Sequence, residues 1–519
     1  MRHGFAIDQR KCIGCHACTV ACKEENQVPL GVNRTWVKYI EKGTFPDTRR
    51  YFSVLRCNHC DNAPCVTICP TVALYRRPDG IVDFDGDRCI GCKSCMQACP
   101  YDALYIDPET QTAAKCHYCA HRVEVGLEPA CVIVCPVQAI VPGDLDDPNS
   151  GIARLVATQQ VAVRKPEQGT QPKLFYLGAD EAALTPAMQE NSQRYAFAQA
   201  SRIPTPGQRN VAAAGQAVSN GGGDVDLLRM ARTVYDVAHA ERPWGWKVST
   251  YLWTKSIAAG SLLMATIEPG WNMPPTIPSL ISLVFLALTV LLLTFDLKRP
   301  ERFLYLFFKP NWRSWLVWGG WILLVFGGLG SLWFLGGVLH ANRLLLSLAW
   351  PTALVALAAA GYSAFLFSQA EGRDFWQSPL VLPHLIVAAL AAGSATLLLP
   401  ALWLYPSDLF YFVPPPTWGL SELMARFLLI HVVLILLELF AKHSNQDAAS
   451  AARLIRQGKL RLRLWGGVVV GGVAIPLLLL GTPALPWGSA LAAVLALGGL
   501  WLWEDIWVRA GQALPLSCG

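Results

Sequence analysis

The chain has 519 residues, of which 53% are hydrophobic and only 15% are charged, a composition too apolar for an ordinary soluble protein. Its net charge of +6 is small for this length, and the basic residues of the second half cluster in short loops between apolar runs, which indicates membrane topology rather than nucleic-acid binding. All but one of the 17 cysteines lie at or before Cys135, whereas the long apolar runs follow Gly245, so the chain has two unlike parts.

The first part contains four groups of four cysteines. They are Cys12, Cys15, Cys18 and Cys22; Cys57, Cys60, Cys65 and Cys69; Cys89, Cys92, Cys95 and Cys99; and Cys116, Cys119, Cys131 and Cys135. The first and third groups read C-x2-C-x2-C-x3-C, the spacing of bacterial ferredoxins, in which three close thiolates hold one cubane and the fourth crosses to another. At four thiolates per cubane, the pattern predicts four [4Fe–4S] clusters in a loop-rich α+β domain.

Zinc sites and disulfides are the alternatives. Structural zinc usually takes two well-separated C-x2-C pairs, and disulfides suit small secreted chains. Met1–Asp8 lacks the apolar core of a secretory signal. Four histidines lie among the cysteines, and we expect them either to donate hydrogen bonds near cluster sulfurs or to be plain surface residues. They are His16, His59, His117 and His121.

This pattern resembles the four-cluster iron–sulfur subunits of molybdopterin oxidoreductases, of the DMSO reductase, polysulfide reductase and NrfC type. The resemblance covers Met1 to about Gly143 and implies that the first group exchanges its fourth ligand with the last group, and the second with the third. The implied sets are Cys12, Cys15, Cys18 and Cys135; Cys57, Cys60, Cys65 and Cys99; Cys89, Cys92, Cys95 and Cys69; and Cys116, Cys119, Cys131 and Cys22. Spacing alone equally allows exchange between neighbouring groups.

We predict a cluster domain at residues 1–145, a partly ordered linker at 146–243 and a membrane domain at 244–519. Within the linker, Lys173–Asp180 is expected to form one short strand packed on a neighbour. The Ala-, Gln-, Ser- and Gly-rich remainder is typical of a tether, or of a segment that orders on a partner.

Eight spans are expected in the membrane domain, because a bilayer needs about 20 apolar residues per helix. They are Val248–Ile267, Pro278–Phe295, Ser314–Gly337, Leu344–Phe367, Leu380–Trp403, Leu420–Phe440, Leu464–Leu480 and Ser489–Val508, with a turn at Pro483 and Pro486. Tryptophans near the span ends, including Trp244, Trp246, Trp312 and Trp507, suggest interfacial belts. Basic residues concentrate in Asp296–Arg313 and Ala441–Arg463, on the side shared with the N-terminus, while the opposite loops carry only Arg343. This asymmetry places the cluster domain on the cytoplasmic face.

The stretches Asp296–Trp315 and Tyr251–Leu263 resemble NrfD/PsrC-type quinone-reactive membrane anchors, an eight-helix family. Ionisable groups inside spans are costly and therefore suggest function. Lys255, Tyr251 and His384 are our candidates for hydrogen bonds to a quinone head group, with snorkelling of Lys255 and ordinary packing of the other two as the alternatives.

Further polar residues mark other spans. Arg426, His431 and Glu438 share the sixth span and suggest either a proton relay or a structural hydrogen-bond network. Five acidic residues are expected at solvated cytoplasmic ends, namely Asp296, Glu371, Asp374, Glu504 and Asp505.

Together these patterns predict a ferredoxin-like α+β domain with four clusters, followed by an all-α eight-helix transmembrane bundle in the bacterial inner (cytoplasmic) membrane. The expected function is electron transfer between a separate molybdopterin catalytic subunit and the quinone pool (menaquinone or ubiquinone), as a subunit that itself carries no molybdenum site. The expected surroundings are membrane lipid and that partner, with no nucleic acid. The alternatives are an anchor of a membrane hydrogenase and a quinone-coupled proton-translocating module.

Overall fold

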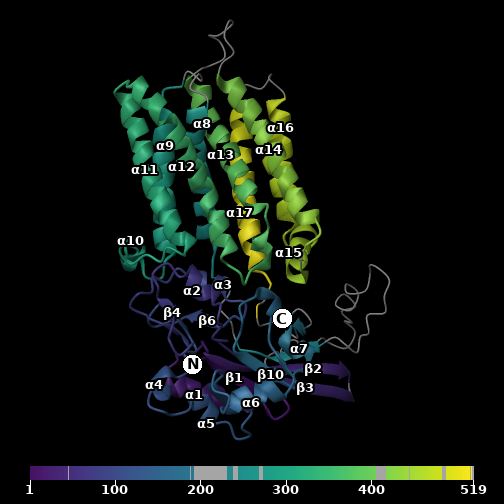
Figure 1. Ribbon diagram of the computed structural model, residues 1–519. Coiled ribbons are helices and arrows are strands. Elements are labelled where there is room, and N and C mark those ends of the chain that lie inside the picture. Colours follow the sequence, from purple (N-terminus) through teal and green to yellow (C-terminus); the bar gives the residue numbers. More distant parts are fainter. Residues whose placement is uncertain are drawn as a thin grey trace.

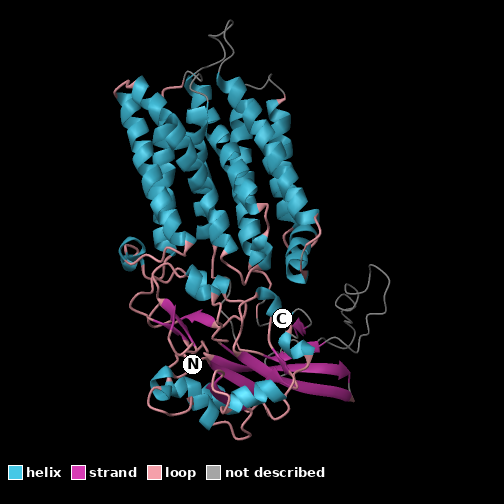
Figure 2. Cartoon of the chain, viewed as in Figure 1, coloured by secondary structure: helices cyan, strands magenta, loops and turns pink. Residues whose placement is uncertain are grey.

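A bundle of long helices stands on a smaller part that holds the strands of the described residues (Figures 1 and 2). The computed structural model describes residues 1–44, 46–186, 189–191, 231–237, 243–267, 273–404, 416–443, 445–481, 487–514 and 516. The predicted order, a mixed α/β region followed by helices, is confirmed.

The first sheet has the strand order β8-β1-β10-β9. Its strands are β1 (His3–Asp8), β8 (Ile140–Asp144), β9 (Val161–Ala162) and β10 (Leu174–Leu177). Strand β1 pairs antiparallel with β8 and parallel with β10, and its Phe5, Ala6 and Ile7 are buried. The strand expected within Lys173–Asp180 therefore forms as β10, and it packs on the first strand of the chain.

The second sheet has the order β11-β12-β2-β3. Its strands are β2 (Thr35–Thr44), β3 (Asp47–Arg56), β11 (Gln189–Asn191) and β12 (Ala231–Tyr235), and two hairpins are formed by β4 (Leu74–Arg76), β5 (Val82–Phe84), β6 (Leu104–Ile106) and β7 (Ala113–Lys115). Strand β3 is exposed where it begins and buried where it ends, so it carries Arg56 into the interior directly before Cys57.

Short helices form within the cysteine groups. They are α1 (Ala17–Glu25), α2 (Pro64–Ile68), α3 (Ser94–Ala98), α4 (Ala120–Val123) and α5 (Ala130–Ile133), with α6 (Gly151–Thr158) and α7 (Glu181–Leu184) farther along. Helices α2 and α3 lie directly beneath the bundle, whereas α1, α4 and α5 lie at the far end (Figure 1). The second and third cysteine groups are therefore near the membrane part, and the first and fourth are remote from it.

Seven helical segments of the described residues are long and apolar enough to cross a membrane. They comprise α9 (Thr276–Asp296), α11 (Trp315–Val338), α12 (Asn342–Ser368), α13 (Val381–Leu404), α14 (Pro416–Phe440), α17 (Gly488–Gly511) and a π-helical segment (Arg463–Ala474) continued by α16 (Ile475–Leu480). Two short helices, α10 (Tyr305–Phe308) and α15 (Gln446–Arg456), lie at the foot of the bundle (Figure 1). The expected turn at Pro483 and Pro486 lies outside the described residues.

The first expected span forms helix α8 (Trp246–Ile267), which is not among those seven. It packs against α9, α12, α13 and α17, and Leu252, Ile257 and Ala259 are fully buried. A helix enclosed by other helices can carry polar side chains that hydrogen-bond to its neighbours, which lowers its mean apolarity.

Small residues bring the helices into backbone contact, as is common in membrane bundles. A Cβ atom on Gly260 of α8 would lie 1.8 Å from the carbonyl oxygen of Ala389 in α13, and one on Gly393 would lie 2.2 Å from the carbonyl carbon of Gly260. Because no side chain fits there, these glycines set how closely α8 and α13 approach.

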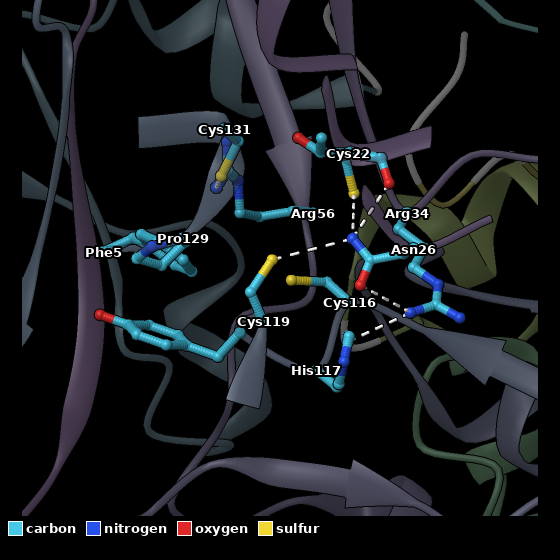
Figure 3. A pocket seen from close by; sticks show the side chains of 12 residues that line it. Phe5, Cys22, Asn26, Arg34, Arg56, Cys116, His117, Cys119, Pro129 and Cys131 are labelled. Atoms are coloured by element: carbon cyan, nitrogen blue, oxygen red, sulfur yellow. Dashed lines mark hydrogen bonds between the residues drawn. The ribbon is translucent and has the colours of Figure 1, made fainter. Parts of the chain in front are cut away.

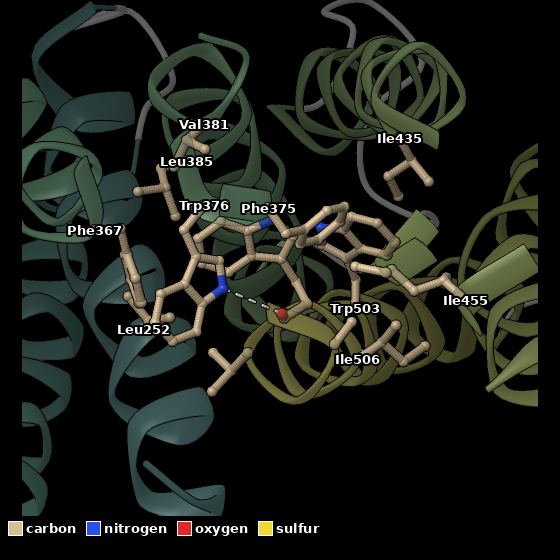
Figure 4. Close-up of a cluster of buried hydrophobic side chains, with 14 of the residues drawn as sticks. Leu252, Phe367, Phe375, Trp376, Val381, Leu385, Ile435, Ile455, Trp503 and Ile506 are labelled. Atoms are coloured by element: carbon tan, nitrogen blue, oxygen red, sulfur yellow. Dashed lines mark hydrogen bonds between the residues drawn. The ribbon is translucent and has the colours of Figure 1, made fainter. Parts of the chain in front are cut away.

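Aromatic side chains fill the foot of the bundle (Figure 4). The rings of Trp244 and Trp376 stack with centroids 5.4 Å apart, and Phe367 contacts the edge of Trp507 at 4.7 Å. Trp244 and Trp507 are thus buried core residues, and their prediction as interfacial belt residues is wrong. Trp246 and Trp312 are exposed, as a belt requires.

Candidate cluster cavities and buried polar groups

One cavity in the far end of the α/β part is lined by Cys22, Cys116, Cys119 and Cys131, and we call it the Cys116 cavity (Figure 3). It combines the last cysteine of the first group with three of the fourth group. Arg56, Arg34, Asn26 and His117 also line it.

Two further cavities lie closer to the bundle. The Cys60 cavity is lined by Cys57, Cys60, Cys65 and Cys99, and the Cys89 cavity by Cys69, Cys89, Cys92 and Cys95. We call the remaining four cysteines the Cys12 set; they are Cys12, Cys15, Cys18 and Cys135. Cys12 lies close enough to Cys15 and Cys135 for their charges to interact. Cys12 and Cys135 also pack against the cluster of buried hydrophobic residues that contains Cys18. Spacing had left open which groups exchange a cysteine, and the structure brings together the first group with the fourth and the second with the third.

The residues around these cavities fit iron–sulfur cubanes. Each of the three cavities is lined by four thiols. Within the described part of the chain no three His, Cys, Asp or Glu side chains are close enough to share one metal ion. Backbone N–H groups also point at sulfur: the amides of Gly91 and Ala113 lie 3.4 and 3.3 Å from Cys89 Sγ.

Burial raises the pKa of several thiols in these sites. The pKa of Cys116 rises to about 12, that of Cys92 to about 12 and that of Cys99 to about 11, in each case chiefly because the thiolate would lose its hydration. Bound iron would supply the positive charge that displaces these protons.

The loops repeat one backbone conformation. In the first and third groups the glycine between the first two cysteines has a positive φ (Gly14, +71°; Gly91, +68°), as does the residue after the second cysteine (His16, 62°; Lys93, 64°). Such turns aim successive amides toward one point and favour a bound anion.

The histidines among the cysteines differ in burial and in their hydrogen-bond partners. His59 is buried; its Nδ1 accepts from the amide of Val82, and Nε2, which then carries the proton, has no partner among the described residues. His117 accepts at Nδ1 from Arg34, and burial lowers its pKa to about 3. His121 is a surface residue paired with Glu25. The surface interpretation therefore holds for His121 and is wrong for His59.

The sites follow one another toward the membrane part. Cys18 of the Cys12 set lies close to Cys131, Cys116 lies close to Cys57, and Cys95 lies close to Cys65. The order from the far end is therefore the Cys12 set, the Cys116 cavity, the Cys60 cavity and the Cys89 cavity.

Residues of the bundle hydrogen-bond to the loop of the third cysteine group. The amides of Lys298 and Arg299 donate to the carbonyls of Gly91 and Ile90, and Trp244 Nε1 donates to the Cys92 carbonyl at 3.3 Å. Lys93 forms an ion pair with Asp296 at 2.8 Å, so the prediction that Asp296 is a solvated charge is wrong.

The second group is held in the same way. Asn311 Nδ2 donates to the carbonyl of Cys69 at 2.7 Å, and Ser314 Oγ donates to that of Ile68. Gly372, after α12, lies against the carbonyls of Gln97 and Cys99, and Leu366 of α12 belongs to the buried cluster that contains the thiols. The Cys60 and Cys89 cavities therefore share packing with the bundle.

Lys255 is buried in the bundle and does not snorkel. Its Nζ donates to the carbonyl of Ala360 at 2.7 Å and to Ser363 Oγ at 2.9 Å, both on α12, and lies 4.8 Å from the centroid of the Tyr362 ring. Tyr251, one turn nearer the cluster side on the same helix, is also buried. The charge of Glu504 acts on both residues.

His384 contacts two other helices of the bundle. Its ring lies 4.4 Å from that of His431 on α14 and 5.4 Å from that of Trp503 on α17. Neither nitrogen of His384, nor Nε2 of His431, has a hydrogen-bond partner within the described residues. His384 therefore lies beside α14 and α17, whereas the hydrogen bonds of Lys255 go to α12.

The polar residues of α14 do not act as one set. His431 and Glu438 are buried, and Glu438 accepts from Trp507 Nε1 at 3.1 Å. Arg426 is exposed and paired with Glu422. Glu504 and Asp505 are also buried, so their prediction as solvated charges is wrong; Asp505 accepts from Arg463 and Arg509.

Sequence reasoning missed three residues of the Cys116 cavity. Arg56 Nη1 donates to Cys131 Sγ at 3.1 Å, Asn26 Nδ2 lies 3.6 and 3.7 Å from the sulfurs of Cys22 and Cys119, and Arg34 Nη1 donates to Asn26 and His117 (Figure 3). Arg56 immediately precedes Cys57, but that position alone does not reveal which cysteines it faces.

Known protein families match both parts of the chain. The model for "Polysulphide reductase, NrfD" matches residues 236–505, the model for a 4Fe-4S dicluster domain matches residues 48–145, and that for a 4Fe-4S binding domain matches residues 10–26.

Relatives of the first part are subunits of reductases. A tetrathionate reductase subunit from Salmonella typhimurium is 49% identical over 191 residues, which cover 36% of this chain and 76% of the relative. A polysulfide reductase subunit from Wolinella succinogenes is 44% identical over 179 residues (34% and 93%), and protein NrfC of Escherichia coli is 46% identical over 178 residues (34% and 80%). Each of these relatives is matched over 34–36% of this chain, and the family models match two different parts, so the chain combines two units. The chain belongs to the polysulphide reductase NrfD family through its membrane part and to the iron–sulfur subunits of reductase complexes through its first part, and it is a fused electron-transfer and membrane-anchor subunit.

Proposed function

We propose that this subunit passes electrons between a separate molybdopterin catalytic subunit and the membrane quinone pool through four [4Fe–4S] clusters. The observation that carries the proposal is the linear order of the four cysteine sites, from the exposed far end to the foot of the bundle. Each cluster exchanges one electron at a time, so a row of centres connects two-electron chemistry at a catalytic partner with two-electron chemistry at a quinone.

The sixteen cysteines are the proposed ligands, in the sets that line the three cavities together with Cys12, Cys15, Cys18 and Cys135. The catalytic subunit docks at the far end, where Cys15 is exposed and where the segments of the first and fourth cysteine groups carry exposed apolar side chains. These are Ile13, Val20, Val125, Leu127 and Ile133. Apolar exposure of this kind is typical of a surface that a partner covers.

The quinone head group is bound on the cluster side of the bundle by Lys255, Tyr251 and His384. Lys255 uses two of its N–H groups within the bundle and retains a third donor. His384 is buried with both nitrogens unpartnered among the described residues, which is costly unless a ligand supplies a hydrogen bond. Helix α8, which carries Lys255 and Tyr251, also crosses the membrane, which brings the number of spans to eight.

The chain lies in the bacterial cytoplasmic membrane with its cluster domain facing the cytoplasm. The basic loops at the foot of the bundle support this orientation. The proposed domains are 1–145 for the clusters, 146–243 for the linker and 244–519 for the anchor; the pairing of β1 with β10 supports an ordered first section of that linker. A reporter fused after Gly519 is expected to be active in the cytoplasm, and periplasmic activity would reverse the orientation.

The test combines iron content with quinol-linked reduction. The chain, purified anaerobically in detergent, is expected to carry about sixteen iron atoms at four per cubane. Lys255→Met and His384→Ala are expected to retain this iron and their reduction by dithionite, but to lose most of their reduction by quinol.

The matched control is His340→Ala, because His340 is exposed beyond the far end of α11. A wild-type iron content far below sixteen contradicts the cluster assignment. Normal quinol-linked reduction in both Lys255→Met and His384→Ala contradicts the quinone site.

Buried acidic residues favour proton translocation as a second candidate function. Glu438 and Glu504 are buried close enough for their charges to interact, and the charge of Glu504 reaches Lys255. In proteoliposomes, Glu438→Gln is expected to reduce proton uptake coupled to quinol oxidation, and unchanged uptake would remove this candidate.

A further inference from the structure

The Cys116 cavity differs from the other two in the arginines that line it. Two arginines line it, and Arg56 is 1% exposed. Neither Arg nor Lys lines the Cys60 cavity, and the one lysine of the Cys89 cavity, Lys93, is neutralised by its ion pair with Asp296.

Arg56 has no carboxylate partner within the described residues. Its Nη1 donates to Cys131 Sγ, its guanidinium carbon lies 4.6 Å from the centroid of the Phe5 ring, and its Nε and Nη2 are buried without a partner. The charged groups that act on it most strongly are the thiols of Cys131, Cys116 and Cys18. A buried cation left in this state is strongly unfavourable, so the structure requires a negative charge beside it.

We propose that Arg56 holds the cluster of the Cys116 cavity at a higher reduction potential than the clusters of the Cys60 and Cys89 cavities, making it the electron-retaining centre of these three. The proposal rests on the proposed cluster function. A cubane with four thiolates carries net negative charge, and reduction adds one electron. Hydrogen bonds and positive charge near the sulfurs stabilise that added charge, and in a buried site the attraction is weakly screened.

Asn26 acts in the same sense but without charge. Its Nδ2 group points between the sulfurs of Cys22 and Cys119, and its Oδ1 is held by Arg34 (Figure 3). Arg56 and Asn26 therefore approach one centre with donors from different elements, β3 and the residue that follows α1.

The position in the row gives this centre a role. It is second from the far end, between the Cys12 set and the Cys60 cavity. An electron resting there is separated from the quinone side by two centres of lower potential, so Arg56 favours holding charge close to the catalytic partner.

The test is an anaerobic redox titration of the purified full chain, followed by electron paramagnetic resonance. Arg56→Gln is expected to make one centre of four harder to reduce, with its reduced-to-oxidised ratio at a fixed potential falling about tenfold, which is 59 mV for a one-electron couple. A loss of this size matches one hydrogen bond to a charged group. Asn26→Ala is expected to move the same signal in the same direction by less, and Arg56→Lys, which keeps the charge, to restore most of the potential.

Arg50→Gln is the matched control, because Arg50 lies on the same strand but is 48% exposed and paired with Glu41. The proposal is overturned if Arg56→Gln binds full iron with unchanged potentials, if Arg50→Gln shifts the same centre equally, or if Arg56→Gln and Asn26→Ala act on different centres. Where Arg56→Gln loses a cluster, Asn26→Ala decides: no shift at full iron content overturns the proposal. A wild-type chain without four centres would instead contradict the cluster assignment itself.

Discussion

Gly91→Ala tests how closely the third cysteine loop fits the membrane part. Gly91 has a φ of +68°, and a Cβ atom there would lie 2.5 Å from Lys298 Cβ, 3.0 Å from the carbonyl oxygen of Gln111 and 3.1 Å from Lys298 Cα. Two of these three atoms belong to the backbone, so the crowding cannot be relieved by rotating a flexible side chain.

Two penalties add at this position. A non-glycine residue in the left-handed region costs about 1–2 kcal/mol. Forcing an extra carbon into a filled contact costs about 1–3 kcal/mol more. Gly126→Ala isolates the first penalty, because Gly126 has a φ of +79° and a Cβ atom added there would meet no atom within 4 Å. The expected difference between the two variants is therefore about 1–3 kcal/mol.

The assay is thermal loss of the cluster absorbance in the full chain, held anaerobically in detergent, together with iron content and quinol-linked reduction. Each kcal/mol is expected to lower the transition by about 2–4 °C for a domain of this size. Gly91→Ala should also slow quinol-linked reduction, because its contact joins the cluster domain to the bundle. Equal transitions for Gly91→Ala and Gly126→Ala, at equal iron content, would refute the fit between Gly91 and Lys298.

Three further predictions concern the contacts that join the elements. Arg302→Ala removes donors to the carbonyls of Gly86 and Cys89 and is expected to weaken the docking of the cluster domain on the bundle by about 1.5–3 kcal/mol. Reduction by quinol should slow, whereas reduction by dithionite should not. The control variant Arg313→Ala, at an exposed residue, should cause neither effect, and equal effects of the two variants would contradict the role of Arg302. Hydrogen bonds from Arg50 and Arg232 hold the pKa of Glu41 below its usual value. The pairing of β12 with β2 is therefore fully stabilised above about pH 4.3, the usual pKa of a glutamate. It weakens by up to about 1 kcal/mol as the pH falls through the lower pKa that Glu41 has in the folded protein. Amide exchange of β12 should report this, and Glu41→Gln should abolish the pH dependence; a dependence that persists in Glu41→Gln would assign it elsewhere. Gly472→Val places a Cβ atom 2.5 Å from Gly499 Cα and is expected to destabilise the bundle by about 1–3 kcal/mol in thermal denaturation. Gly498→Val, with open space around it, should not destabilise the bundle. Similar losses in the two variants would contradict the close backbone contact between Gly472 and Gly499.

Local patterns account for much of this fold. The apolar runs predict helices within a few residues of their observed ends, for example Leu420–Phe440 against α14 at Pro416–Phe440. They succeed because a lipid-spanning helix satisfies its own backbone and needs only length and apolarity. The same reasoning assigned Glu504 and Asp505 to solvent, because a helix end viewed alone does not show what packs beside it.

Local pattern also says little about charge deep in the fold. Arg56 ends a strand whose first residues are exposed, and nothing in "SVLRC" distinguishes a buried arginine from a surface one. Its burial depends on Phe5 and Cys131, residues distant in the chain.

The sequence by itself determined two things: thiols separated by only a few residues, such as Cys12, Cys15 and Cys18, lie close together, because their spacing is short, and the second half forms apolar helices, because its runs match a bilayer. Only the tertiary structure decided which distant cysteine completes each set, which loops of the bundle grip the third group, and which charges are buried. Those outcomes join residues such as Cys22 and Cys116 across the whole domain, and such contacts are selected by the packing of entire elements rather than by the preferences of neighbouring residues.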